Sequence, residues 1–344
     1  MYVIFRDSGA DLTAGRFSLA TGFVIVGGQP RAVQGPRREI IIRTTEQPMS
    51  DFVTAASPTY ETAEPVLYSV EGSIAWIMLN RPRYHNAQNG QMLYALDAAF
   101  RRALDDSAVK AIVLGGEGKH FSAGHDIGTP GRDVAVSHER AHLIPDHVDK
   151  PGAEFLYTRE HEVYLGMCRR WRAMSKPMVA MVQGGCIAGG LMLAWCCDLI
   201  VAAEDAFFQD PVLTMGIPGV EYWAHPFELP PRVAAELLLL GERMSAQRAH
   251  HFGMVNRVVP REQLRAECGK IAGRLAQQPA LGVWLTKQAI SHAEDLRGKR
   301  TAMDAVYHMH HFAHAQNDLV HGSSIADMDA KAMAGANKER AGEG

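Results

Sequence analysis

Short apolar runs of strand length alternate with amphipathic helical patterns through the middle of the chain, and this alternation constrains the fold most. Residues 66–79 are predicted as a strand because they contain the run IAWIML and are closed by Asn80-Arg81-Pro82. Within 89–104, Met92, Leu96 and Phe100 recur at helical spacing. Strands are also predicted at 109–114, 178–182 and 199–203, and helices at 157–174 and 190–197. Such alternation predicts βαβ units and an α/β fold.

The two ends of the chain differ from this middle part. The first 48 residues mix Gly, Arg and Pro without a helical period, and MSDF at 49–52 is typical of a natural start. We therefore expect an N-terminal extension over 1–65, of which 1–48 is hypothesised not to be native. A core over 66–260, a C-terminal helical region over 261–320 and a fraying tail over 321–344 complete the predicted organisation. Towards the C-terminus, helices are expected at 232–240, 246–252, 261–276, 280–293 and 301–318.

Composition excludes several broad classes of protein. Hydrophobic residues make up 47% of the 344 residues and charged residues 21%, which are globular values. The net charge of −3 argues against nucleic acid as the main partner. No apolar run reaches the ~18–20 residues needed to cross a bilayer, so a membrane role is not expected. The five cysteines include no C-x-x-C spacing and are interpreted as reduced core thiols of a cytoplasmic protein.

Two glycine-containing segments carry the chemistry that can be inferred from the chain. One is FSAGHDI at 121–127, after a predicted strand, and the other is GGCIAGGLM at 184–192, which follows a strand and opens a helix. Helix starts present free N–H groups with partial positive charge, and glycine allows a ligand close to the backbone. Two such N–H groups could stabilise an oxyanion. Phosphate binding and simple tight packing remain alternatives, although neither segment fits a nucleotide-binding fingerprint.

The order and spacing of several motifs resemble the crotonase family, also called the enoyl-CoA hydratase/isomerase family. The resemblance covers about 66–318 and rests on LNRP with NA at 86–87, FSAGHD at 121–126, KP at 176–177, QG at 183–184, AGG at 188–190, CDL at 197–199, GIPG at 216–219, GER at 241–243 and GMVN at 253–256. Each motif is modest alone, but together and in this order they are specific.

The resemblance implies a spiral of ββα turns, a C-terminal helical region and assembly into a trimer or a dimer of trimers. It implies a coenzyme A thioester as substrate, with no separate cofactor, and a lyase or isomerase of fatty acid or other lipid metabolism. The thioester oxygen would lie between the backbone N–H groups of His125 and Gly189. The substrate path would be lined by Ala87, Ala123, His125, Asp126, Ile127, Gly128 and Gly189, with Arg83 available to a CoA phosphate.

The chain departs from the hydratase pattern at both positions where that branch carries glutamates. These positions are Met192 and Val212, which cannot move protons. Glu221, between a glycine turn and Tyr222-Trp223, is the candidate replacement, with a pKa expected to be raised by an apolar pocket. A surface or subunit-contact role for Glu221 is the alternative. The imidazole of His125 could act near neutral pH, but a role of its backbone alone is preferred.

Three reaction outcomes therefore stay open. Hydration is the commonest activity of the resembled family, whereas one carboxylate suffices for isomerisation, and hydrolase or lyase variants are possible. A non-catalytic acyl-CoA-binding protein would explain the missing glutamates. A serine peptidase using Ser122 is disfavoured because no His and Asp partners are evident.

A histidine-rich stretch ends the predicted helical region. His308, His310, His311, His314 and His321 lie close together, and some share a helix face at i, i+3 or i+4 spacing. A metal site is one interpretation. A polar helix face that covers the active site or contacts another subunit is preferred, so no metal is predicted.

Overall fold

The fold was analysed in a computed structural model, which describes residues 64–128, 140, 144–148, 150–326, 328, 331–333 and 335. These residues belong to one compact unit, Ser57–Gly344. The hypothesis that 1–48 is not native falls outside the described residues. The predicted boundaries between extension, core, helical region and tail stay predictions.

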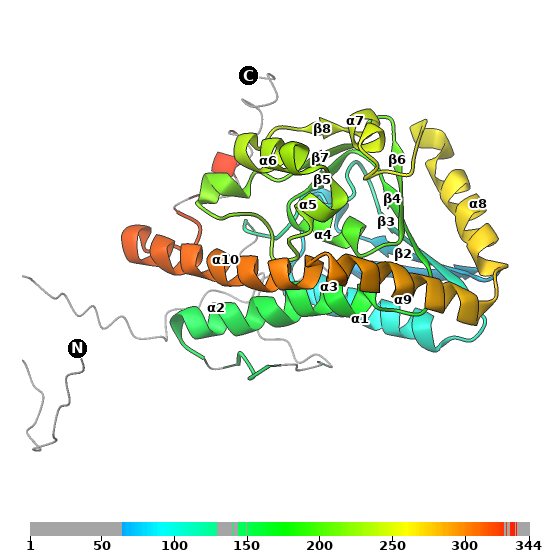
Figure 1. The fold of residues 1–344 in the computed structure, drawn as a ribbon, viewed down its shortest axis with the longest axis horizontal. Helices are drawn as coiled ribbons and strands as arrows, with labels where there is room; N and C mark the ends of the chain where they lie inside the picture. The colour runs from blue at the N-terminus through cyan, green and yellow to red at the C-terminus, as the bar shows by residue number, and fades with distance from the viewer. Residues whose placement is uncertain are drawn as a thin grey trace, which may run out of the picture. The chain divides into compact units, whose positions relative to one another are not determined.

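A six-stranded sheet runs through the unit in the order β1-β2-β3-β4-β6-β9 (Figure 1). Its first two strands form an antiparallel hairpin, and each later pair is parallel. The strands are β1 (Val66–Glu71), β2 (Ile74–Leu79), β3 (Ala111–Gly116), β4 (Met178–Val182), β6 (Leu199–Ala203) and β9 (Arg257–Val259). A second sheet has the order β5-β7-β8, from β5 (Gly185–Ile187), β7 (Phe207–Gln209) and β8 (Met244–Ser245).

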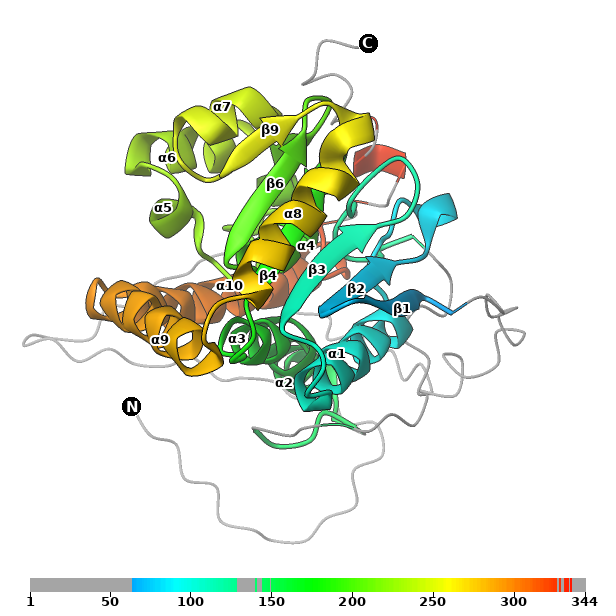
Figure 2. The same cartoon turned by 90° about the vertical axis from the view of Figure 1, so that its right-hand side faces the viewer.

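Helices connect the parallel strands and cover both faces of the larger sheet (Figure 2). They are η2 (Pro82–Tyr84), α1 (Gly90–Asp105), α2 (Gly152–Glu160), the π-helix η3 (His161–Gly166), α3 (Met167–Arg172), α4 (Gly189–Trp195), η4 (Val212–Met215), α5 (His225–Glu228), α6 (Pro231–Leu240), α7 (Ala246–His251), η5 (Arg261–Gln263), α8 (Leu264–Ala276), α9 (Ala280–Leu296) and α10 (Lys299–His321). Helix α10 packs against α2, and the two lie side by side in Figure 1.

Both faces of the larger sheet are buried at its central strands β2, β3, β4 and β6, which explains why these strands are apolar throughout. Alternate side chains point to opposite faces, so Ala75, Ile77 and Leu79 of β2 enter the main core. Trp76 and Met78 point the other way, into a second core closed by α8. A strand buried on both sides must be apolar throughout, as the sequence pattern indicated.

The predicted strands at 178–182 and 199–203 are confirmed at both ends. The single strand predicted over 66–79 is wrong, because Gly72 turns the chain with φ +60° and makes a hairpin. The helix predicted over 157–174 is interrupted by the π-helix η3. Helix α2 begins at Gly152, five residues before the predicted helical range.

The cysteines lie in the interior of the fold. All five cysteines are free and buried, and burial raises the pKa of the Cys186, Cys196, Cys197 and Cys268 thiols. This agrees with their interpretation as reduced core thiols. Among the helices within the described ranges, none combines the length and the hydropathy that crossing a membrane requires.

Candidate active site

The two glycine-containing segments meet at the junction of the two sheets. Ser122 and Cys186 form an isolated parallel bridge, in which Ser122 donates to the Gly185 carbonyl and Ile187 donates to the Ser122 carbonyl. Ser122 Oγ donates to the Asn86 carbonyl and accepts from Gln88 Nε2 and the Gly124 amide. Its hydroxyl therefore ties backbone together, which agrees with the rejection of a nucleophilic serine.

Gly124 allows these two segments to approach each other closely. It has φ +92°, and a Cβ there would lie 2.9 Å from the Ile187 carbonyl oxygen and 3.1 Å from the Gly189 nitrogen. Only glycine satisfies both the left-handed backbone and the close approach. Ala188, the residue before Gly189, also has positive φ, at +47°. Backbone strain of this kind in a non-glycine residue is typical of functional sites.

The amides of His125 and Gly189 are not used by the fold in the part of the chain that the structure describes. Within the described residues, neither N–H donates a hydrogen bond to a protein acceptor. Gly189 is the first residue of α4, where an amide has no intrahelical partner. The Gly189 backbone lies beside the His125 ring, and the pairing of the two amides on one oxygen stays a prediction.

The His125 ring is held between Glu221 and Tyr164. Its Nε2 lies 2.9 Å from Glu221 Oε2, and the ring stacks on Tyr164 with centroids 3.7 Å apart. The other ring nitrogen, Nδ1, is buried without a protein partner among the described residues. It faces Gly189, because a Cβ on that glycine would lie 2.8 Å from Nδ1.

The prediction of a raised pKa for Glu221 is wrong. Glu221 is only 2% exposed, and burial alone would raise its pKa. The contact with His125 and the nearby His310 outweigh burial, so the pKa lies well below its usual range. The sequence argument counted Tyr222 and Trp223 as neighbours, but the decisive neighbours are histidines far away in the chain. Glu221 therefore stays ionised and can only accept hydrogen bonds.

The predicted substrate-lining residues divide into exposed and structural groups. Arg83 is exposed in η2, and Ala87 and Ile127 are half-buried. Asp126 is buried and ion-paired with Arg81 at 2.9 Å, while its other oxygen accepts from the Gly128 amide. Asp126 thus fixes the turn that carries His125, which is a structural role rather than the predicted contact with substrate.

Met192 and Val212 are both buried in the main core. Neither offers an acid or base, and the loss of the two hydratase glutamates at these positions stays a prediction. Nearby Asp210 forms a fully buried pair with His225 at 2.8 Å and accepts from the Val212 amide. No sequence signal pointed to that pair.

Several residues of the site could not be found from the sequence. Tyr164 is one, since it lies on the π-helix, a feature that is frequent at functional sites. Gln88 is another, being buried with an unpartnered Oε1 only 3.1 Å from the Gly189 Cβ position. The preferred interpretation of the histidine-rich stretch as a polar face is also incomplete, because His310, His311 and His314 are buried.

The His120 side chain joins the segment before Ser122 to strand β5 through one hydrogen bond. Its Nδ1 accepts the Gly185 amide at 2.8 Å. Burial, with help from neighbouring cations, lowers the pKa of His120 to about 4. The ring therefore stays neutral and remains an acceptor at physiological pH.

Asn86 is expected to stabilise the segment before Ser122 more than any other single side chain, because it hydrogen-bonds to three separate backbone groups. It is fully buried with φ +55°, accepts from the Arg81 amide and donates to the Glu117 and His120 carbonyls. Asn86→Ala removes three hydrogen bonds and should lower the free energy of unfolding by about 2–4 kcal/mol. Urea denaturation measures this loss.

The matched control for Asn86 is Asn89→Ala. Asn89 only caps α1, accepting from the Met92 amide, so its loss should cost about 1 kcal/mol. Equal effects of the two substitutions would contradict the proposed importance of the Asn86 bonds.

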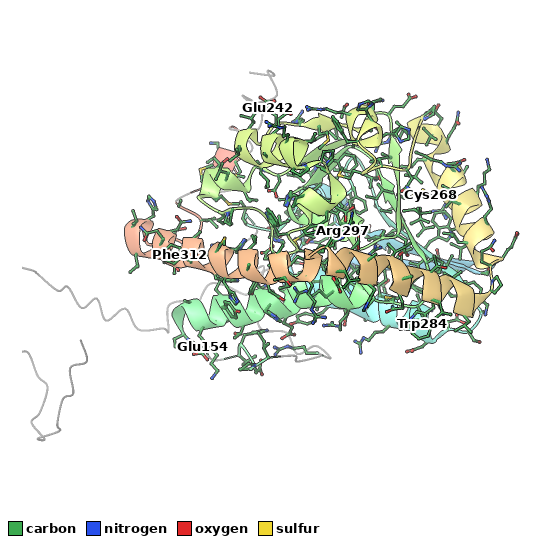
Figure 3. All side chains as sticks on the ribbon, viewed as in Figure 1. Glu154, Glu242, Cys268, Trp284, Arg297 and Phe312 are labelled. Atoms are coloured by element: carbon green, nitrogen blue, oxygen red, sulfur yellow. The ribbon has the colours of Figure 1, made fainter. Side chains whose placement is uncertain are left out.

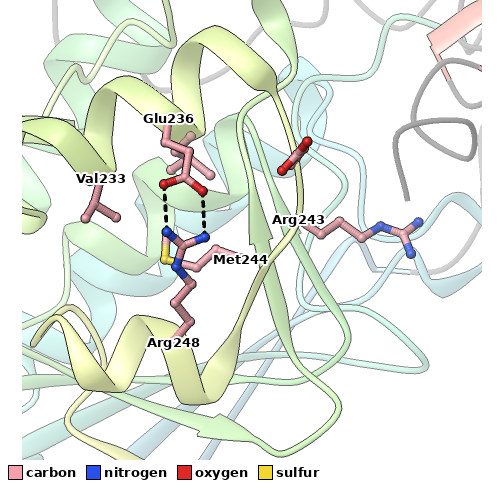
Figure 4. A pocket seen from close by; sticks show the side chains of 7 residues that line it. Val233, Glu236, Arg243, Met244 and Arg248 are labelled. Carbon is pink, nitrogen blue, oxygen red and sulfur yellow. Dashed lines mark hydrogen bonds and ion pairs between the residues drawn. The ribbon is translucent and has the colours of Figure 1, made fainter. Parts of the chain in front are cut away.

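A surface pocket lies away from this site, between α6, β8 and α7 (Figure 4). It is bridged by the Arg248–Glu236 ion pair and is lined also by Val233, Arg243 and Met244. None of the residues that meet around His125 borders it.

Comparison with known proteins identifies the scaffold. The sequence profile described as enoyl-CoA hydratase/isomerase matches residues 69–142 and 154–325. This chain belongs to the enoyl-CoA hydratase/isomerase family. One relative is EchA13 of Mycobacterium tuberculosis, whose name describes it as an enoyl-CoA hydratase. It is 38% identical to this chain over 276 residues, which cover 78% of this chain and 83% of EchA13.

Solved structures of the family agree. A probable enoyl-CoA hydratase from Mycobacterium thermoresistibile superposes with a TM-score of 0.69 at 44% identity, covering 76% of this chain and 98% of that one. Another, from Mycobacterium smegmatis, gives 0.68 at 42% identity with the same coverage. The crotonase-type α/β fold predicted from the motifs is confirmed, and membership supports an enzyme of the lyase or isomerase type.

Proposed function

We propose that this chain binds an acyl-CoA thioester and converts it through a thioester enolate, using His125 as the acid–base group. The observation that carries the proposal is the His125–Glu221 contact of 2.9 Å, beside two amides that have no acceptor among the described residues. The amides of His125 and Gly189 would hold the thioester oxygen as negative charge develops on it. Preorganised N–H donors of this kind stabilise an enolate far more than water does.

The roles of the two side chains follow from their hydrogen bonding. Ionised Glu221 is an acceptor only, so Nε2 of His125 carries the proton of this contact and Nδ1 keeps its lone pair. Nδ1 faces Gly189, where the thioester would lie, and is free of protein partners among the described residues. His125 would thus remove a proton from the carbon next to the thioester carbonyl, while Glu221 orients the ring and stabilises its charged form.

One acid–base group favours isomerisation among the reactions of the family. The proton that His125 removes from the α-carbon can be returned to the γ-carbon, which shifts a 3,4 double bond into conjugation. Met192 and Val212 leave no second acid in the usual places. Hydration is the second candidate, because the family and the relatives above carry hydratase names. It would require a further group to activate water.

Substrate binding and assembly are also proposals. Exposed Arg83, next to the Asn80-Arg81-Pro82 turn, would meet a CoA phosphate, and the chain would need no separate cofactor for enolate formation. Exposed apolar side chains on α9 and α10, among them Trp284 and Phe312, favour burial in a homotrimer or a doubled trimer (Figure 3). A cytoplasmic location stays a prediction from the sequence.

An assay with paired substrates tests the reaction. Purified protein is given a 3-enoyl-CoA and the isomeric 2-enoyl-CoA, and products are separated by chromatography and mass spectrometry. The proposal expects conversion of the 3-enoyl ester to the 2-enoyl ester without a mass change. Gain of one water by the 2-enoyl ester at a higher rate would favour hydration. Binding of both esters without turnover would indicate a non-catalytic homologue and overturn the proposal.

A further inference from the structure

A second cluster of titratable groups lies behind Glu221, where α10 packs on α2. Glu160, the last residue of α2, meets His310, His311 and His314 of α10. The Nε2 atoms of these histidines lie 3.6, 3.4 and 3.7 Å from Glu160 Oε2. All four side chains are at least nine-tenths buried.

The hydrogen bonds of this cluster leave its centre without a conventional partner. Glu160 Oε2 and His311 Nε2 are both buried and have no hydrogen-bond partner among the described residues. Such a carboxylate oxygen is costly to bury unless a cation neutralises it. The unpartnered atoms point to an occupant between them.

The outer nitrogens of two histidines are already engaged. His310 Nδ1 lies 2.8 Å from the Gly219 carbonyl and His314 Nδ1 lies 2.7 Å from the Ser324 carbonyl. Since a carbonyl only accepts, each Nδ1 donates, and each Nε2 faces the centre. This is the arrangement of metal-binding histidines, whose second ring N–H is fixed by a backbone carbonyl or a carboxylate.

The separations of the inner atoms also fit a small metal ion. Donors at about 2.0–2.2 Å from a tetrahedral zinc ion lie about 3.3–3.5 Å from one another. His310 Nε2 and His314 Nε2 lie 2.9 Å apart, and each lies 3.6–3.7 Å from Glu160 Oε2. Movements of a few tenths of an ångström would therefore produce the required triangle. His311 Nε2 lies 3.4 Å from Glu160 Oε2 but outside this group of three mutually close ligand atoms.

We propose that Glu160, His310 and His314 bind a zinc ion. Imidazole nitrogens and carboxylate oxygens are both zinc ligands, and a buried site between two helices would serve structure rather than catalysis. The ion would clamp α10 to α2 directly behind Glu221, since His310 Nε2 lies 3.7 Å from Glu221 Oε1. This site is independent of the proposed reaction.

A proton is the competing occupant. Burial lowers the pKa of His310, but Glu160 and Glu221 outweigh burial and raise it to about 9. A proton shared between His310 and His314 would then bridge the two Nε2 atoms. The same negative field that retains a proton favours a divalent cation, which would displace it on binding.

A second group of possible metal ligands differs from the Glu160 cluster, because its carboxylates already have a cationic partner. Asp146, His147 and Glu162 also lie within ligand distance of one another. There, however, Arg140 donates to both oxygens of Glu162 and to Asp146, so the carboxylates are already neutralised. That grouping carries no proposal.

The test measures metal content in protein made without a polyhistidine tag. The full chain is loaded with excess ZnCl₂, desalted and analysed by plasma mass spectrometry. About one zinc ion per chain is expected to be retained, and zinc should raise the Tm because it binds the folded state. Folded wild-type protein that retains no zinc and shows no Tm shift would overturn the proposal and indicate the shared proton.

Variants locate the ion. His314→Ala and Glu160→Gln should each reduce retained zinc at least about tenfold and abolish the Tm shift, as loss of a ligand does. His308→Ala is the matched control, because His308 lies exposed on the same helix outside the cluster. Circular dichroism establishes that each variant is folded. Equal zinc retention in His314→Ala and His308→Ala would show adventitious binding and would also overturn the proposal.

Discussion

Replacing Glu221 by glutamine is expected to lower kcat on the preferred acyl-CoA by about 10²–10⁴, the usual contribution of general acid–base catalysis. Glutamine has nearly the same shape but no charge, so it neither fixes the tautomer of His125 nor stabilises the protonated ring. Acyl-CoA binding should remain, since the amides of His125 and Gly189 are unchanged. Steady-state kinetics together with calorimetric binding measures both effects.

The control for Glu221→Gln is Glu236→Gln. Glu236 is ion-paired with Arg248 at the surface, in a pocket that none of the residues around His125 borders, so turnover should be unchanged. If Glu221→Gln turns over as fast as the wild type, His125 does not depend on Glu221, and the proposed pairing has no catalytic role.

Gly189→Ala is expected to lower kcat by about 10²–10³, the usual cost of losing one oxyanion donor. The new methyl group would lie 2.7–2.8 Å from two atoms of the His125 ring, so the ring must move. Both the donor geometry and the position of Nδ1 are then disturbed. The assay is turnover of the same acyl-CoA by folded variant protein.

Gly273→Ala controls for the effect of a methyl group. Nothing lies within 4 Å of the corresponding Cβ position on α8, so activity should be unchanged and stability slightly increased. Unchanged turnover in Gly189→Ala would show that the substrate oxygen does not lie between these amides.

The strands and helices could be predicted where burial dictates the pattern. Residues 178–182 and 199–203 are apolar throughout because both sheet faces are covered, so their ends are visible as turns. The hairpin at Gly72 escaped prediction because β1 faces solvent in part and carries polar residues. The π-helix also escaped, since an extra residue in a helical turn leaves no periodic signature.

The backbone part of the site was more predictable than its side chains. His125 and Gly189 lie in glycine-containing motifs that are local in sequence, and motif order indicated both. The partnership of His125 with Glu221 joins residues 96 positions apart, and Glu160 meets His310 across 150 positions. Local pattern contains no information about such contacts, which is why the pKa of Glu221 was predicted in the wrong direction.

The most direct test of the enolate is exchange of the α-proton of a saturated acyl-CoA with solvent. Wild-type protein is incubated in D₂O with acyl-CoA esters of several chain lengths, and deuterium at the α-carbon is measured by mass spectrometry. The proposal predicts deuterium uptake with wild-type protein and its near-complete loss in Glu221→Gln. Wild-type protein that binds the ester but incorporates no deuterium would contradict the central claim that His125 and the two amides generate a thioester enolate.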